Sequence, residues 1–119
     1  LEHSASIGIN TRVLALGGAR GGIATDEAHA FDSYRNEWTS YRLPIKRFAA
    51  VAVRMGKQDV AILGGIDKSG SIVDSFHVLE MEDMKLRDSD YRLPAARAHS
   101  SVVDLRDEFL LIGGIDRGE

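Results

Sequence analysis

The sequence has no cysteine, only two prolines and no long apolar segment. Without cysteine it can form no disulfide, no thiolate nucleophile and no cysteine-ligated metal site, which fits a reducing compartment. No stretch approaches the ~18 apolar residues of a membrane-spanning helix, and the N-terminus lacks the pattern of a signal peptide. We therefore expect a cytoplasmic protein that does not insert into a membrane. Because the chain starts without methionine and enters a repeat almost at once, we also expect a processed or truncated piece of something longer.

An excess of charge of one sign is also lacking. The 119 residues include 15 Lys or Arg and 18 Asp or Glu, which gives a net charge of -3 with the two signs interspersed. This balance provides no basic patch for nucleic acid. With 44% hydrophobic and 28% charged residues, the composition is that of one soluble globular domain.

An apolar run closed by two glycines occurs three times in the chain. The copies are Val13 to Gly18, Val60 to Gly65 and Phe109 to Gly114, and their first glycines lie 47 and 49 residues apart. Such near-constant spacing is typical of a repeat architecture.

The repeat extends well beyond the glycines. Each copy follows a short run of small or apolar residues and a polar break, which is the pattern of a β-hairpin. A third apolar segment follows at 28–32 and 76–80, and Tyr-Arg-Leu-Pro recurs at 41–44 and 91–94. We expect four short strands in each unit, closed by a proline that ends the hydrogen-bonded ladder. The only helical structure we expect is a brief turn within 80–86.

The order of residues in the first unit resembles the kelch repeat. A double glycine, an aromatic residue followed by an acid at Phe31, then Trp38, a Leu-Pro pair and Arg47 appear in that order. The resemblance implies an all-β fold in which each unit is a four-stranded antiparallel blade of a β-propeller. The second unit departs from the pattern, because Leu79 and Leu86 stand where the first unit has Phe31 and Trp38.

The resemblance divides the chain into blades. Residues 1–119 form a single partial propeller domain, with the first blade at 3–47, the second at 48–97 and the first hairpin of a third at 98–119. Propellers close with about 4–8 blades, so this is an incomplete propeller. Open blade faces tend to associate. We expect a fragment of a longer propeller, with self-association through the exposed blade faces as the alternative.

The recurring residues have physical roles in this scheme. A glycine pair after a buried strand permits a positive φ and a close backbone approach between neighbouring blades. Trp38 is expected to be a large apolar plate buried between adjacent blades. Arg47 and Arg97 recur at one place in the unit and are expected to tie blade backbone together.

No group of residues points to catalysis or to a metal. The four histidines form two pairs at equivalent repeat positions, His3 with His99 and His29 with His77. We expect each pair on different sheets and not converging on one metal ion, although His3 and His99 begin the innermost strands and could line a central pocket. The glycine-rich segment 17–22 lacks the lysine and hydroxyl residue of a phosphate-binding loop. We therefore predict no cofactor, no metal site and no catalytic residue.

Binding is expected at a loop face, because loops on a rigid scaffold can vary without disturbing the core. In kelch propellers that capture peptides, contacts come from the position after the repeat arginine and from the loop after the double glycine. Carried over to this chain, these positions are Arg20, Phe48, Asp67, Lys68, Ala98, His99, Asp116 and Arg117. Both charge signs are present, so no preference for a ligand of one charge follows.

The resemblance implies a non-enzymatic module that recruits a protein or peptide partner, as substrate adaptors of ubiquitin ligases and cytoskeletal scaffolds do. The alternative is a fragment of a kelch-type carbohydrate-acting enzyme, such as a sugar epimerase. Copper chemistry of the galactose oxidase type needs a cysteine, which the chain lacks, and no acid–base pair stands out. We therefore favour the interaction module.

Overall fold

The computed structural model describes residues 2–56, 58–105 and 108–115. All regular secondary structure in these residues is β-strand, and none of it is a helix that would span a bilayer. The strands are β1 (Ala5–Ile9), β2 (Arg12–Leu16), β3 (Ala19–Arg20), β4 (Ile23–Asp32), β5 (Glu37–Arg47), β6 (Val51–Met55), β7 (Asp59–Leu63), β8 (Ser75–Glu80), β9 (Lys85–Arg92), β10 (Ser101–Asp104) and β11 (Phe109–Ile112).

The first sheet contains β1 to β5. Strands β1, β2, β4 and β5 pair in that order, each antiparallel to the next, and β3 pairs with the start of β4. Asn10 and Asn36 have φ values of 55° and 57° in two of the turns between strands. Asparagine tolerates this left-handed conformation better than most residues. Because β3 pairs with the start of β4, the segment 19–25, which was expected to be a loop, is a small hairpin that lengthens β4.

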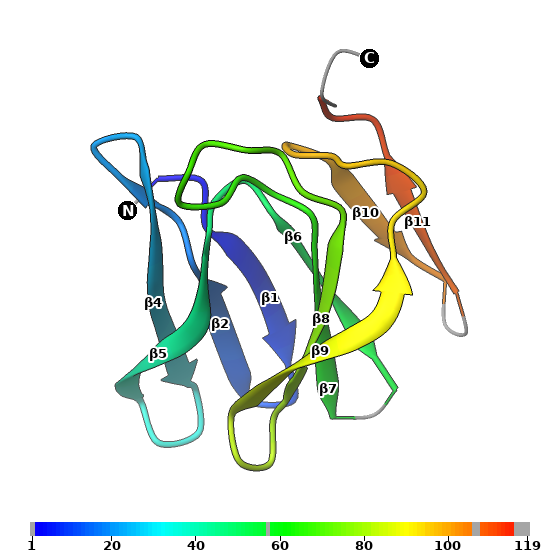
Figure 1. The fold of residues 1–119 in the computed structure, drawn as a ribbon. Helices are drawn as coiled ribbons and strands as arrows, with labels where there is room; N and C mark the ends of the chain where they lie inside the picture. The colour runs from blue at the N-terminus through cyan, green and yellow to red at the C-terminus, as the bar shows by residue number, and fades with distance from the viewer. Residues whose placement is uncertain (1, 57, 106–107, 116–119) are drawn as a thin grey trace.

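The second sheet repeats this arrangement. Strands β6, β7, β8 and β9 pair antiparallel in sequence order, and the hairpin β10–β11 begins a third sheet (Figure 1). The expected all-β fold with antiparallel sheets is confirmed. The expected helical turn within 80–86 is instead a tight β-turn between β8 and β9, since both flanking strands continue the sheet ladder up to it.

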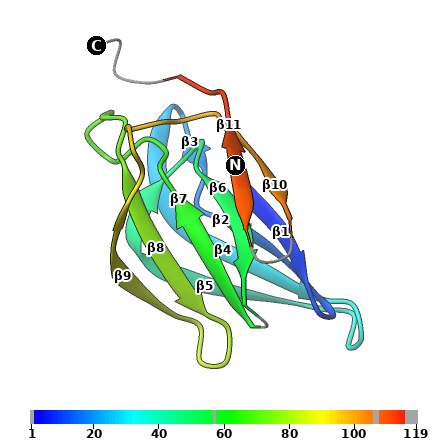
Figure 2. The same cartoon turned by 90° about the vertical axis from the view of Figure 1, so that its right-hand side faces the viewer.

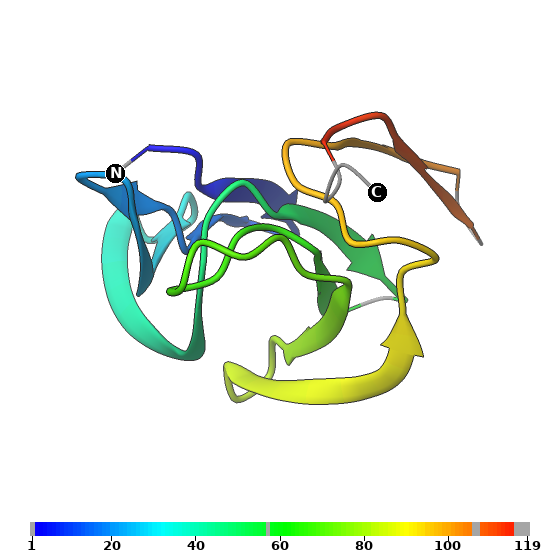
Figure 3. The ribbon, with the colours of Figure 1, turned by 45° about the horizontal axis from the view of Figure 1, so that its top comes forward.

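The three sheets lie beside one another, and their first strands, β1, β6 and β10, are neighbours (Figures 2 and 3). One apolar cluster fills the space between the first and second sheets, with Leu14, Leu16, Val60 and Leu79 at its centre. A smaller cluster around Leu63 joins the second sheet to the third hairpin. The second sheet is thus covered on both faces, whereas the other two are covered on one.

The expectation for Trp38 is wrong in this structure. Trp38 is 68% exposed, and its ring forms an aromatic pair with the neighbouring Phe31, with centroids 5.1 Å apart. The equivalent Leu86 packs against the core between the two sheets. The difference has a simple cause. Leu86 packs toward the first sheet, whereas Trp38 lies on the face of the first sheet that no other sheet of the described residues covers.

Candidate functional site

The connections of the chain lie at two opposite ends of the sheets (Figure 1). One end holds the turns between successive strands, and we call it the turn end. The other holds the glycine pairs and the connections from one sheet to the next, and we call it the crossover end. The predicted binding residues that the structure describes lie at the crossover end, whereas Asp116 and Arg117 fall outside the described residues.

The crossover end is built around the close passage of the chain over each glycine pair. Gly17 and Gly64 have φ values of 70° and 63°, and a methyl group at either position would overlap the carbonyl oxygen of Arg47 or Arg97. The second glycine of each pair donates its N–H to that same carbonyl, at 2.8 Å in the first unit and 2.7 Å in the second. The glycines do allow a close backbone approach, but each pair meets the arginine at the end of its own unit, so the expectation of an approach between neighbouring blades is wrong. The contact fixes where the chain leaves each sheet.

Arg20 lies on β3 and is already paired within the chain. Its Nε and Nη2 donate to the two carboxylate oxygens of Glu27 at 2.6 and 3.0 Å. This two-pronged, charge-assisted contact is the main reason that the pKa of Glu27 falls to about 2. Arg20 is therefore a poor candidate for contacting a ligand through its charge.

Asp67 shapes the loop that follows the second glycine pair. Its Oδ1 accepts the backbone N–H groups of Ser69 and Ser71 at 2.9 and 3.0 Å and the Ser69 hydroxyl at 2.7 Å. These bonds, the hydroxyl bond foremost, hold the pKa of Asp67 below its usual value. Such side-chain bonds to nearby backbone are the usual function of aspartate in a turn. Asp67 thus supports the loop that presents the exposed Lys68.

A pocket of about 520 Å³ lies between this loop and the end of β5. It is lined by Pro44, Lys46, Arg47, Asp67, Lys68 and Ser69. Three of the lining side chains are cationic and one is anionic. Because one oxygen of that anion is engaged by three donors of its own loop, positive charge dominates what the pocket presents to a ligand.

Arg47 is the half-buried cation of this pocket. Burial lowers the pKa of its guanidinium from the ordinary value, and the nearby Asp67 opposes the shift; arginine nonetheless stays charged in proteins. Its Nη1 donates to the carbonyl of Lys46 at 2.8 Å, but its Nε is buried without a hydrogen-bond partner among the described groups. Arg97, at the same repeat position, instead reaches Gly113 at 3.3 Å, which is the tie between units expected from the sequence.

Three aromatic rings gather at the crossover end, where the sheets begin. The ring centroids of His3 and His99 are 5.1 Å apart in an edge-to-face contact, and those of His3 and Phe48 are 6.4 Å apart. His3 and His99 precede strands of different sheets, and their rings meet because the starts of the inner strands converge at the crossover end. The described residues contain no group of three or more His, Asp or Glu that could hold a metal ion.

Ala98 must be removed from the predicted contact residues. It is only 1% exposed, and its backbone N–H and carbonyl pair with Ile115 at 2.9 and 2.8 Å. Phe48 makes the same backbone pairing with Ile66 at 3.0 and 2.8 Å, but its larger side chain stays half-buried and reaches the surface. The repeat position thus fixes the backbone, and the side chain decides whether it can touch a ligand.

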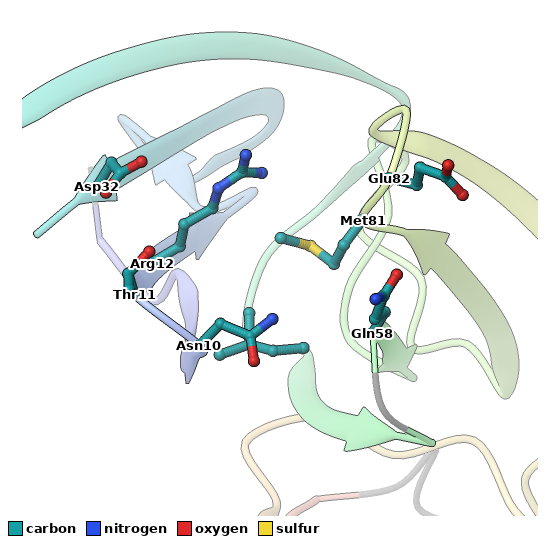
Figure 4. A pocket seen from close by; sticks show the side chains of 8 residues that line it. Asn10, Thr11, Arg12, Asp32, Gln58, Met81 and Glu82 are labelled. Atoms are coloured by element: carbon teal, nitrogen blue, oxygen red, sulfur yellow. The ribbon is translucent and has the colours of Figure 1, made fainter. Parts of the chain in front are cut away.

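A second pocket, of about 300 Å³, lies at the turn end between the first two sheets (Figure 4). It is lined by Ile9, Asn10, Thr11, Arg12, Asp32, Gln58, Met81 and Glu82. Met81 is one of the buried residues of the core between these sheets, and Figure 4 shows its side chain reaching toward the first sheet. The lining residues come from four separate segments without a shared motif, which is why sequence patterns did not identify this pocket.

The sequence missed Lys46 and Ser69 at the crossover end, and it named His3 only as a residue lining a central pocket. Each lies within two residues of a predicted position or matches one through the repeat, so extending each predicted position to its neighbours would have found them. Comparison with protein-family models gives no match for this chain, and comparison with curated proteins gives no significant match.

Proposed function

We propose that the chain is a portion of a kelch-type β-propeller that acts, without catalysis, as a module binding a protein partner at its crossover end. The repeated antiparallel sheets and the equivalent passage of Arg47 and Arg97 over the glycine pairs support the assignment of its units as blades. The connections at the crossover end sit on a rigid sheet scaffold, which is where recognition surfaces usually occur. The lack of cysteine fits action in a reducing compartment such as the cytoplasm.

The observation that carries this proposal is the charge left available in the pocket at the end of β5. Arg20 is neutralised by Glu27, and Asp67 is engaged by its own loop. Lys46, Arg47 and Lys68 remain to receive a ligand group of opposite charge. The partner is therefore expected to offer an acidic side chain, for which the guanidinium fork is well suited.

The aromatic rings at the crossover end supply the second part of a binding surface. Phe48 directly follows Arg47 in the sequence, so an apolar side chain and a partly desolvated cation are both available at this end of the molecule. Aromatic residues and arginine are the residue types that most often dominate binding energy at protein interfaces. An acidic residue flanked by an apolar one is the sequence feature we expect in the partner.

The proposed function can be tested by measuring binding of the chain to a peptide array and to a glycan array. The array carries peptides of equal length with acidic, neutral or basic centres. We expect retention of acidic peptides, weaker at high salt, and no retention of glycans. The double variant Lys46→Glu, Lys68→Glu should weaken peptide binding about tenfold or more, since 1.4 kcal/mol is a factor of ten.

The control is Lys85→Glu, which makes the same type of substitution, with half of the charge change of the double variant, on an exposed residue at the turn end. It should leave peptide binding unchanged. Binding to glycans alone, or undiminished peptide binding by the double variant, would contradict the proposed function and favour a carbohydrate-acting protein or a different surface.

A further inference from the structure

Two faces of the molecule expose apolar residues at positions that are buried elsewhere in the repeat. On the third hairpin, Leu110 is 50% exposed and Ile112 is 52% exposed. The same positions relative to the glycine pair are Leu14 and Leu16 in the first sheet, which are 0% and 3% exposed. Val103 lies directly opposite Leu110 across the hairpin, and it is also exposed. We call Val103, Leu110 and Ile112 the trailing face.

The first sheet shows the same contrast on its opposite side. Val13 is 50% exposed, whereas Val60, at the same position in the second sheet, is 0% exposed. Val13 lies opposite Phe31, and Phe31 lies opposite Trp38, so all three project from one side of the sheet. We call Val13 and Phe31 the leading face, and Trp38 lies beyond its outer edge on β5.

The two faces are the two halves of an interface that the chain already contains. Between the first and second sheets, Leu14 and Leu16 pack against Val60 and Ile62. Leu110 and Ile112 of the trailing face correspond to the first pair, and Val13 of the leading face corresponds to Val60. Each copy of the chain therefore carries one surface of each kind, at opposite ends of its row of sheets.

We propose that a second copy of this chain covers these faces head to tail, with the trailing face of each copy packed on the leading face of the other. Two identical contacts of this kind close a ring with twofold symmetry. Each copy contributes two complete sheets and one hairpin, so the ring has six sheet positions, within the range of about 4–8 at which propellers close.

The backbone at the crossover end continues in the same direction. The N–H of Ala49 donates to the carbonyl of His3 at 2.9 Å, and the N–H of His99 donates to the carbonyl of Ala49 at 2.9 Å. Each bond links the start of one inner strand to the start of the one before it. The next bond in the series joins the N–H of His3 in the second copy to the carbonyl of His99, as the head-to-tail arrangement requires.

The outer part of the junction stays open. Among the described residues the third hairpin has two strands. In the proposed ring it covers Val13 of the other copy but does not reach over β5 of that copy, where Trp38 lies. Trp38 is the only tryptophan in the chain. Its fluorescence therefore reports separately on the outer strands, and it should keep the red-shifted emission of an exposed indole when two copies associate.

The test is the molar mass of the purified chain by light scattering and sedimentation over a range of concentrations. We expect a species of two chains. Val13→Asp disables the leading face in both junctions and Leu110→Asp disables the trailing face in both, so each variant alone should be a single chain. An equimolar mixture should restore a weaker two-chain species, because one junction then joins two unaltered faces. Tyr34→Asp, at an 86% exposed turn residue outside both faces, is the control and should still associate.

Circular dichroism confirms that each variant is folded, and Val13→Ser with Leu110→Ser replaces any variant that is not. A wild-type chain that stays single at every concentration overturns the proposal. Association that survives in one single variant means that a face packs on its own kind, which also overturns it. A ladder of larger species, or burial of Trp38 on association, overturns the closed two-copy ring.

Discussion

The second sheet and the third hairpin carry the same repeat in different surroundings. Leu63 and Ile112 both stand directly before a glycine pair, yet Leu63 is 1% exposed and Ile112 is 52% exposed. Gly64 and Gly113 have nearly equal φ values, 63° and 66°. The chain crosses Gly64 at the Arg97 carbonyl, whereas no described atom outside the local chain lies within 4 Å of a methyl group placed on Gly113.

This comparison separates the backbone structure, which depends on local sequence, from burial, which depends on a neighbouring sheet. The strand, the turn and the left-handed glycine form in both places, so they depend on local sequence. Burial differs because a face becomes core only where another sheet covers it. In repeat proteins, stability is approximately a sum of unit and interface terms, and here the same unit is seen with and without one interface.

The largest expected difference concerns the strand residue before the glycines. Leu63→Ala should lower the free energy of unfolding by about 2–5 kcal/mol, because it removes a fully buried side chain and leaves a cavity. Ile112→Ala should cost about 1 kcal/mol or less, because half of that side chain is already in water. Urea unfolding at a concentration where the chain is monomeric measures both. Equal losses would show that the third hairpin is packed as tightly as the second sheet.

A smaller difference is expected at the glycines themselves. Alanine at either Gly64 or Gly113 must adopt a left-handed conformation, which costs about 1–2 kcal/mol. At Gly64 the new methyl group also overlaps the Arg97 carbonyl, and relieving such an overlap typically adds about 1–3 kcal/mol. Gly64→Ala should therefore have the lower midpoint in urea. If the two variants unfold at the same midpoint, the crossover does not press on the glycine.

The local features could be predicted from the sequence because they depend on short-range chemistry. The apolar runs, the polar breaks and the glycine pairs sufficed for the strands and for the close approach at Gly17 and Gly64. Trp38 could not be placed correctly, because its burial depends on a neighbouring sheet and not on its own surroundings. The family resemblance supplies that neighbour, whereas this chain does not.

The candidate site was predictable only in part, for a related reason. Repeat positions located Phe48, Lys68 and His99 at one end of the molecule, but they could not show that Ala98 is buried there. The mixed charges of the predicted residues also hid a bias. Glu27 neutralises Arg20 through an ion pair across the β3–β4 hairpin, and no repeat pattern in the sequence predicts this pair. The positive character of the pocket is therefore evident only in the three-dimensional structure.

His29 and His77 allow the same comparison between the first and second sheets, with a smaller expected effect on the free energy of unfolding. His29 and His77 occupy the same repeat position, but 33% of the His29 side chain is exposed and only 11% of the His77 side chain. The first sheet covers His77, whereas His29 lies on the side of the first sheet that the described chain leaves open. Burial is the main reason that the pKa of His77 falls below 6.5, and the charge of Asp88 opposes this shift.

That lowered pKa fixes the direction of the smallest predicted effect. Between the folded value and 6.5 the unfolded chain binds more protons than the folded chain, so the contribution of His77 is complete above pH 6.5 and is lost as the pH falls. One group can change the free energy of unfolding by at most about 1.4 kcal/mol per pH unit. His77→Gln should reduce the loss of stability between about pH 7.5 and about pH 5.5 in urea titrations. Asp88→Asn should increase that loss, because it removes the charge that favours the protonated ring. A greater loss in His77→Gln than in the unaltered chain would mean that Asp88, and not burial, controls His77.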